Sequence, residues 1–172
     1  YWIDNGLLQG APTPQTDTAG NATNLPRIPA FDDAADGNLE SRVRAYLEVN
    51  CAHCHNPAGI ASNTGLFLDA LREVDASYGI CKTPTAAGGG AGGREFDIVP
   101  GDADGSILPF RMNIAGNPEI QMPPISRSVI HAQGVSGVRD WIDNVVDDSY
   151  ANAESCGGGG GGLLDGLLRR AH

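Results

Sequence analysis

The sequence predicts a mainly helical fold with long loops. Two stretches, residues 39–54 and 131–146, place apolar side chains at spacings of three and four residues, which is the pattern of amphipathic helices. Strand patterns are weak throughout, and prolines and 24 glycines interrupt much of the remaining chain. Aromatic residues make up only 6% of the 172 residues, so a prosthetic group could supply missing core volume.

The length suits one domain with extended ends. Residues 1–36 are rich in Pro, Gly, Thr, Asn and Asp and should form an N-terminal arm, docked through apolar residues such as Trp2 and Phe31. The helical domain is expected over 37–150, and residues 151–172 form a glycine-rich tail. Bare glycine backbone can lie close against another surface, so the arm and the tail could join copies of the chain into a homo-oligomer.

The formal net charge of -10 argues against nucleic acid or an anionic membrane surface as a partner. A basic patch on a partner protein is the expected complement. No apolar run is long enough to span a bilayer, so no transmembrane segment is predicted.

The first helix should run from about Leu39 to Cys54. Asp36 or Asn38 can cap its start, and Glu40 suits the positive end of the helix dipole. One side of this helix is expected to be buried and to lead into the residues that follow it: Leu39, Val43, Tyr46, Leu47 and Asn50, then Cys51, Cys54 and His55.

The remaining elements are shorter or lie nearer the C-terminus. The glycine run at 88–93 lacks a following Lys-Ser/Thr and a preceding strand, so it predicts a flexible or tightly turned loop rather than a phosphate loop. A short helix capped by Ser106 should place Leu108 and Met112 on one face. The second strong helix is expected from about His131 to Val146.

Residues 50–59, NCAHCHNPAG, carry the most specific pattern in the chain. A thiol can add to a haem vinyl group to form a thioether, and two vinyl groups need two thiols. Cys51 and Cys54 lie three residues apart at a helix end and can reach both groups. His55 follows the second cysteine directly and is carried under the ring, where its Nε2 can bind iron. The spacing therefore predicts one covalently bound haem.

Zinc, a redox disulfide and a chance match are the alternatives for this motif. A structural zinc site needs four ligands, usually from two cysteine pairs, whereas Cys81 and Cys156 are isolated. A thioredoxin-like site needs a strand–helix setting, and this motif ends a helix in a strand-poor chain. Haem is favoured over these. His53 should face away from both cysteines, as a surface histidine or one that contacts the site indirectly.

Four residues are candidates for a sixth iron ligand: Met112, Met122, His131 and His172. Met122 is favoured because it lies in QMPPI, where two prolines stiffen a loop that could hold a weak thioether ligand. Met112 falls on a helical stripe, where a methionine is usually part of the core. His131 looks like part of a helix start, and His172 ends the chain.

Three segments carry a family resemblance: ESRVRAYLEVNCAHCHNPAG, DIVPGDADGSILPFRM and EIQMPPISRSVIHAQGVSGVRDWID. With Cys-x-x-Cys-His followed by Met-Pro-Pro, residues 37–148 resemble monohaem cytochrome c domains of the class I type. They are most similar to those that form the C-terminal part of larger secreted bacterial proteins. YWIDNGLLQG resembles the segment before such a domain, so Tyr1 is expected within a longer precursor or just after a processing site.

The resemblance implies a cytochrome c-like helical fold around one covalent haem c. It also implies one-electron transfer in the periplasm or extracellular space. The partners would be redox proteins, and no substrate would be transformed. An alternative is a structural subunit of an extracellular assembly or filament, held together by the terminal arms. A haem enzyme or gas sensor would need Met122 not to bind iron.

The resemblance also assigns roles to single residues. It implies that Cys51 and Cys54 hold the haem, with His55 as the proximal ligand and Met122 as the distal ligand. The carbonyl of Pro57 matches the group that accepts a hydrogen bond from the proximal imidazole.

Other positions follow or depart from the family pattern. Trp141 matches the aromatic residue of the last helix, which packs nearly perpendicular on the first helix. Cys81 and Cys156 are extra to the pattern. Haem attachment occurs outside the cytoplasm, where disulfides persist, so their pairing is expected, with two free thiols as the alternative.

Overall fold

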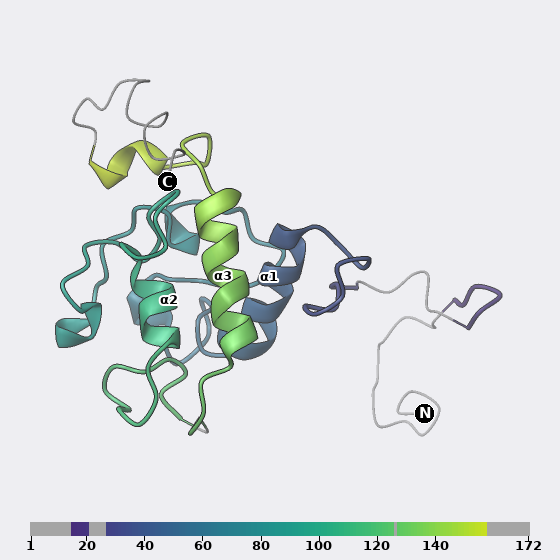
Figure 1. Ribbon diagram of the computed structural model, residues 1–172, viewed down its shortest axis with the longest axis horizontal. Helices are drawn as coiled ribbons and strands as arrows, with labels where there is room; N and C mark the ends of the chain where they lie inside the picture. Colours follow the sequence, from purple (N-terminus) through teal and green to yellow (C-terminus); the bar gives the residue numbers. More distant parts are fainter. Residues whose placement is uncertain (1–14, 21–26, 126, 158–172) are drawn as a thin grey trace.

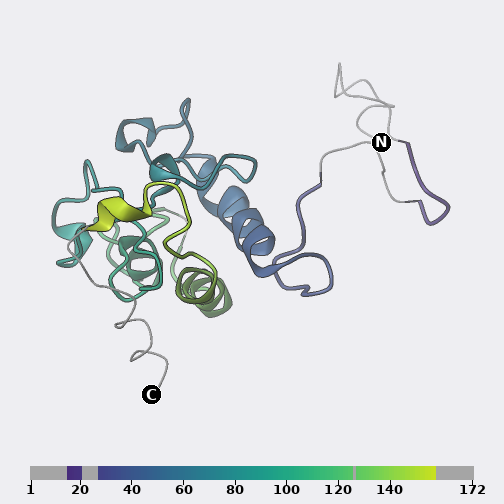
Figure 2. The same cartoon turned by 90° about the horizontal axis from the view of Figure 1, so that it is seen from above.

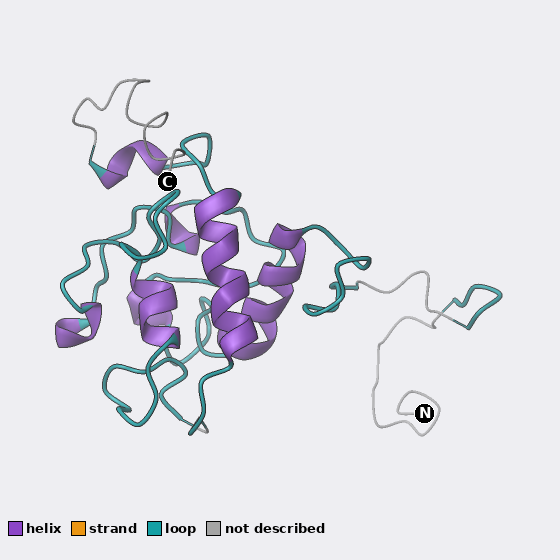
Figure 3. Cartoon of the chain, viewed as in Figure 1, coloured by secondary structure: helices purple, strands orange, loops and turns teal. Residues whose placement is uncertain are grey.

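Helices joined by long loops make up the computed structural model, which describes residues 15–20, 27–125 and 127–157 (Figure 1). The α-helices in this part of the chain are α1 (Leu39–Leu47), α2 (Ile107–Met112) and α3 (Ala132–Asn144). A π-helical turn, Glu48–Ala52, continues α1, and short 3-10 turns occupy Ser62–Thr64, Ala76–Tyr78, Gly88–Ala91 and Ala153–Cys156. Figure 3 shows no strand in the described ranges; isolated β-bridges there include Ile80 with Ile98 and Phe96 with Ser106. The described chain is therefore mainly helical.

Helices α1 and α3 pack against each other at a pair of glycines. A methyl group on Gly134 would lie 2.3 Å from the ring of Tyr46, and one on Gly137 would lie 2.8 Å from the ring of Phe31. Figure 2 shows α3 nearly end-on and α1 from its side, so the two helices cross rather than run parallel. The glycines let the aromatic rings approach the α3 backbone at this crossing.

The core lies between this helix pair and the loops that follow the cysteine motif. Trp141 on α3 is fully buried, and its ring meets that of Tyr78 edge-on with centroids 6.2 Å apart. The side chains packed around them come from every α-helix and from the connecting loops: Val43, Leu47, Leu68, Ile80, Ile98, Leu108, Met112, Val138, Ile142 and Val146. The aromatic residue of the last helix is therefore part of the core.

The two residues considered as caps for α1 have different roles. The side chain of Asn38 accepts a hydrogen bond from the Ser41 N–H at 2.8 Å, so Asn38 caps the helix. Asp36 instead pairs with Arg27 at 2.6 Å and accepts the Ala30 N–H. Asp36 therefore fixes the chain that approaches the helix.

The last part of the predicted N-terminal arm lies against α1. The ring of Phe31 is 4.7 Å from that of Tyr46, and its carbonyl accepts a hydrogen bond from the Arg42 guanidinium at 2.9 Å. The rest of the expected docking, including that of Trp2, falls in residues 1–14 and 21–26, outside the described residues.

Ser106 stands at the N-cap position of α2, but its side chain does not cap the helix. It stabilises the turn before the helix instead. The hydroxyl of Ser106 accepts the Val99 N–H and donates to the Asp102 carbonyl, both at 2.8 Å. The predicted cap is therefore the residue at the start of α2, but its hydroxyl binds the preceding turn. This pins the loop before α2 and sets the direction of the helix.

The C-terminal part of the described chain is tied to the middle by a disulfide. Cys81 and Cys156 are bonded to each other, which is the pairing expected from the sequence. The side chain of Asn152 adds a hydrogen bond to the Ile80 carbonyl at 2.8 Å. Residues 158–172 of the tail, with His172 and the predicted subunit contacts, lie outside the described residues.

The predicted bounds of the helices differ from the observed ones in one informative way. The second helix occupies Ala132–Asn144, close to the expected 131–146, and the glycine run forms a 3-10 turn. The first helix, expected to reach Cys54, changes to a π-helical turn at Glu48.

No helix in the described part of the chain has the length and apolarity needed to cross a membrane.

Candidate functional site

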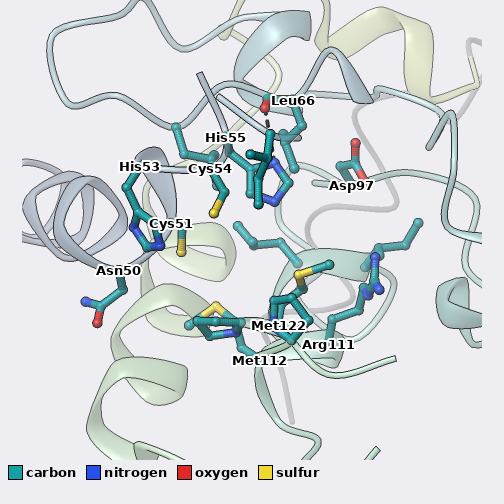
Figure 4. A pocket seen from close by; sticks show the side chains of 16 residues that line it. Asn50, Cys51, His53, Cys54, His55, Leu66, Asp97, Arg111, Met112 and Met122 are labelled. Carbon is teal, nitrogen blue, oxygen red and sulfur yellow. Dashed lines mark hydrogen bonds between the residues drawn. The ribbon is translucent and has the colours of Figure 1, made fainter. Parts of the chain in front are cut away.

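The cysteine motif lies where the π-helical turn ends α1. Such turns widen the helix by one residue and often mark functional sites. Cys51 lies within the turn and Cys54 just after it, and both thiols are free and half-buried. Figure 4 shows the two sulfurs beside the ring of His55, at the edge of one pocket.

His55 is held by backbone groups on both its ring and its own peptide unit. The ring Nδ1 lies 3.2 Å from the Leu66 carbonyl oxygen, and the His55 carbonyl accepts the Leu68 N–H at 2.9 Å. An Nδ1–H that donates to Leu66 leaves the lone pair on Nε2, on the side of the ring that can bind a metal. The ring extends into the pocket (Figure 4).

The acceptor predicted for this imidazole was the Pro57 carbonyl, and this prediction is wrong. The Asn56 side chain donates to the Ala52 carbonyl at 2.6 Å, while its oxygen accepts the Ala58 N–H at 2.8 Å. This turn carries Pro57 to the exposed surface. The chain then loops back, and the Leu66 carbonyl reaches His55 in its place.

Met122 and Met112 lie across the pocket from His55 (Figure 4). Met112 is the last residue of α2 and is buried, as expected for a core methionine. Met122 is half-buried on the loop that follows, and its N–H donates to the Arg111 carbonyl at 3.0 Å. The structure thus brings Cys51, Cys54, His55 and Met122 to one pocket and adds Met112 beside them.

The loop that carries Met122 is organised by three polar side chains. Arg111 on α2 donates through Nε to the Ile120 carbonyl at 2.7 Å. Gln121 is buried, and its amide lies 3.3 Å from the carbonyls of Pro124 and Arg127. Arg127 donates to the carbonyls of both pocket methionines. The loop is therefore fixed by side chain-to-backbone bonds rather than by regular structure.

Two adjoining hollows make up the space at the motif. The first, here called the cysteine pocket, has a volume of about 120 Å³, and the adjoining hollow has about 390 Å³. Together they fall in the range of roughly 300–1,000 Å³ that is common for bound cofactors. Both are lined by Asn50, Cys51, His53, Met112, Met122 and Pro123, and the cysteine pocket adds apolar walls from Ile60, Leu66, Leu68, Ile107 and Leu108.

One buried carboxylate borders the cysteine pocket. Asp97 lies 3.3 Å from Lys82, and both side chains are largely buried. Burial raises the pKa of the Asp97 carboxyl, while the nearby charges of Lys82 and Arg111 oppose the rise. The Asp97 carboxylate therefore lies beside the apolar walls of the pocket and has Lys82 as its charged partner.

Burial dominates the acid–base behaviour of the motif itself. It raises the pKa of the Cys51 thiol to about 12, with Cys54 adding to the rise. Burial also lowers the pKa of His55, against the contact with the Leu66 carbonyl. A redox-active cysteine pair needs a lowered thiol pKa, so Cys51 has the opposite property.

The other residues considered for ligation take different places. His53 is exposed, as expected, yet it borders both hollows. His131 precedes α3, and its ring contacts the Tyr46 hydroxyl at 3.2 Å at the edge of the adjoining hollow. No group of three or more His, Cys, Asp or Glu side chains gathers as a metal site in residues 15–20, 27–125 and 127–157.

The pocket residues fit a covalently bound haem. Two free thiols lie beside an imidazole whose Nδ1 is held by backbone, and a thioether lies on the opposite wall. At the adjoining hollow, the Nε of Arg127 is buried and has no hydrogen-bond partner in the described structure. An acidic group such as a haem propionate could accept a hydrogen bond from this unpaired N–H.

Several residues of the site were not found from the sequence. The Leu66 carbonyl has no side-chain signature, because a backbone acceptor can belong to any residue. Arg111 and Arg127 could have been suspected, since each lies close in sequence to one of the two methionines. Asp97 had no signal, because its partner Lys82 is fifteen residues away.

The chain was compared with known proteins in three ways. No protein-family model, no curated protein and no solved structure matched it.

Proposed function

We propose that the protein transfers single electrons through one covalently bound haem c. Cys51 and Cys54 form its thioether bonds, and His55 and Met122 are its axial ligands. The observation that carries the proposal is the placing of His55 and Met122 on opposite walls of one pocket, with both free thiols at its edge.

The residues of the chain divide the work of such a site. When bound, the haem iron supplies reversible one-electron chemistry. Leu66 orients the imidazole of His55 and keeps the proton on Nδ1. Met122 offers a soft sulfur ligand, which favours the ferrous state and raises the reduction potential.

The walls of the pocket support electron transfer rather than catalysis on a substrate. The pocket has apolar walls that would exclude water from the haem ring: Leu66, Leu68, Ile107 and Leu108. Asp97, the one carboxylate among the described residues of these walls, is bound to Lys82. A haem with both axial positions filled needs no acid–base pair, because no bond of a substrate is broken.

The rim of the site is the place where a redox partner would bind. Four exposed apolar residues line the two hollows: Val49 (68% exposed), Ile60 (86%), Ile125 (66%) and Val129 (75%). Among the described residues lining these hollows, Asp97 is the sole carboxylate. We infer that the partner meets an apolar rim, while a basic patch on it faces the acidic remainder of the chain. Haem attachment places the reaction in the periplasm or extracellular space.

An intact mass and a visible spectrum test the proposal. The mass should exceed that of the polypeptide by one haem, and the ferric protein should show the weak red absorption band of sulfur ligation. Met122→Leu should abolish that band and open the iron to carbon monoxide in the ferrous state. Met112→Leu is the matched control, because Met112 borders the same pocket, and it should keep the band.

Each outcome has a definite meaning. A mass without haem in protein made with the haem-attachment machinery would overturn the proposal. A single haem with no red band and rapid carbon monoxide binding in the unmutated protein would instead indicate an open-site haem enzyme or sensor. Loss of the band in Met112→Leu alone would assign the sulfur ligand to Met112.

A further inference from the structure

Arg127 makes contacts that join the two sides of the methionine wall. Its Nη1 donates to the Met112 carbonyl at 2.8 Å and to the Met122 carbonyl at 2.7 Å. Its Nη2 donates to the Ile114 carbonyl. One guanidinium therefore binds three backbone oxygens, two of which belong to the residues that face His55.

The reason for these contacts is the C-terminal end of α2, where backbone carbonyls need hydrogen-bond donors from outside the helix. The last carbonyls of an α-helix have no partner within the helix, and α2 ends at Met112. A cation at this end is favoured by the helix dipole, and the fork of an arginine can satisfy more than one carbonyl. Arg127 uses this fork to bind the end of α2 and the Met122 loop together.

We propose that Arg127 is the positioning residue of the axial sulfur. It fixes the Met122 backbone relative to α2, and so decides that the Met122 thioether, rather than water or an added ligand, stays at the sixth position. The inference rests on the proposed function, since it assigns the control of that ligand. The three backbone contacts use Nη1 and Nη2 of Arg127, so its Nε remains for an acidic group of the haem.

The other bonds between α2 and this loop lie on the N-terminal side of Met122. The Met122 N–H donates to the Arg111 carbonyl at 3.0 Å, and the Arg111 side chain donates to the carbonyls of Ile120 and Glu119. Gln121 braces the loop within itself, through the carbonyls of Pro124 and Arg127. Removal of the guanidinium therefore frees the Met122 carbonyl from α2 without changing any side chain that faces the iron.

The test compares Arg127→Gln with the unmutated holoprotein. The sulfur band should weaken or disappear, and imidazole should bind the ferric protein at least about tenfold faster, the size expected for losing a charge-assisted hydrogen bond. The Met122 amide should also exchange its hydrogen faster. Arg139→Gln is the matched control, because Arg139 pairs with Asp104 at the surface, and it should change none of these readouts.

The outcomes separate this inference from the proposed function. An unmutated protein without the sulfur band contradicts Met122 ligation, and the exchange rate of the Met122 amide then still decides whether Arg127 holds the loop. If Arg127→Gln does not fold, Arg127→Lys decides, because lysine keeps the charge and lacks the fork. An unchanged band, imidazole rate and amide exchange in the folded variant overturn the inference.

Discussion

The ring Nδ1 of His55 lies 3.2 Å from the carbonyl oxygen of Leu66. This contact closes a loop whose first turn packs against the motif itself. Within that turn the Ala61 N–H donates to the Cys54 carbonyl at 3.1 Å, and Gly59 lies directly beside the same carbonyl. The orientation of the imidazole therefore depends on how closely this loop approaches the second cysteine.

Gly59→Ala tests the close approach. The new methyl group would lie 2.2 Å from the Cys54 carbonyl oxygen and 2.7 Å from its carbon, and this backbone carbonyl cannot swing aside as the end of a long side chain can. We expect a loss of about 1–3 kcal/mol in the free energy of unfolding, the usual cost of overpacking, measured by urea denaturation of the holoprotein. Gly89→Ala is the control, since its methyl group would meet open space. Equal stability of the two variants would contradict the expectation.

The sequence was informative where a pattern repeats or a side chain does the chemistry. Apolar spacing placed the start of α1 and both ends of α3 to within two residues, because burial of one face determines where a helix lies, whereas α1 gives way to the π-helical turn well before Cys54. Cys51, Cys54, His55 and Met122 were chosen for the chemistry of their side chains, and the structure brings all four to one pocket. The Cys81–Cys156 pair was inferred from the compartment that haem attachment requires.

The sequence was least informative where backbone groups decide the contact. The acceptor for His55 was assigned to Pro57, but the Asn56 turn directs Pro57 to the surface and a distant carbonyl takes its place. The π-helical turn before Cys54 has no compositional signature. Arg127 could be read as an ordinary surface cation, because its three acceptors are carbonyls that only the folded loop brings together.

The pH dependence of stability should carry the signature of Asp97. Because burial raises the pKa of this carboxyl in the folded protein, the folded state loses stability relative to the unfolded state as pH rises. That loss begins near the ordinary carboxyl pKa of about 4 and continues up to the raised value. Asp97→Asn lacks this proton, so its stability relative to the unmutated protein should increase with pH through that window.

Urea unfolding of both proteins at a series of pH values measures the difference. Asp104→Asn is the control, since it removes a carboxylate whose side chain is 85% exposed in a surface ion pair. If the stability of Asp97→Asn relative to the unmutated protein instead falls with rising pH, Lys82 outweighs burial. In that case Lys82→Met should lower the free energy of unfolding more than Asp97→Asn does, because it leaves the buried Asp97 carboxylate without its partner.

Electron exchange between two copies of the protein should depend on the apolar rim. Ile125→Asp places a carboxylate beside Met122 and Pro123, where two rims must lose water to meet. Leu71→Asp adds the same charge at a side chain that is 89% exposed and lines neither hollow. We expect the self-exchange rate, measured from line broadening in mixed ferrous and ferric samples, to fall several-fold more in the rim variant. Equal falls in the two variants would assign the effect to the net charge of -10, and unchanged rates would remove the rim from the contact.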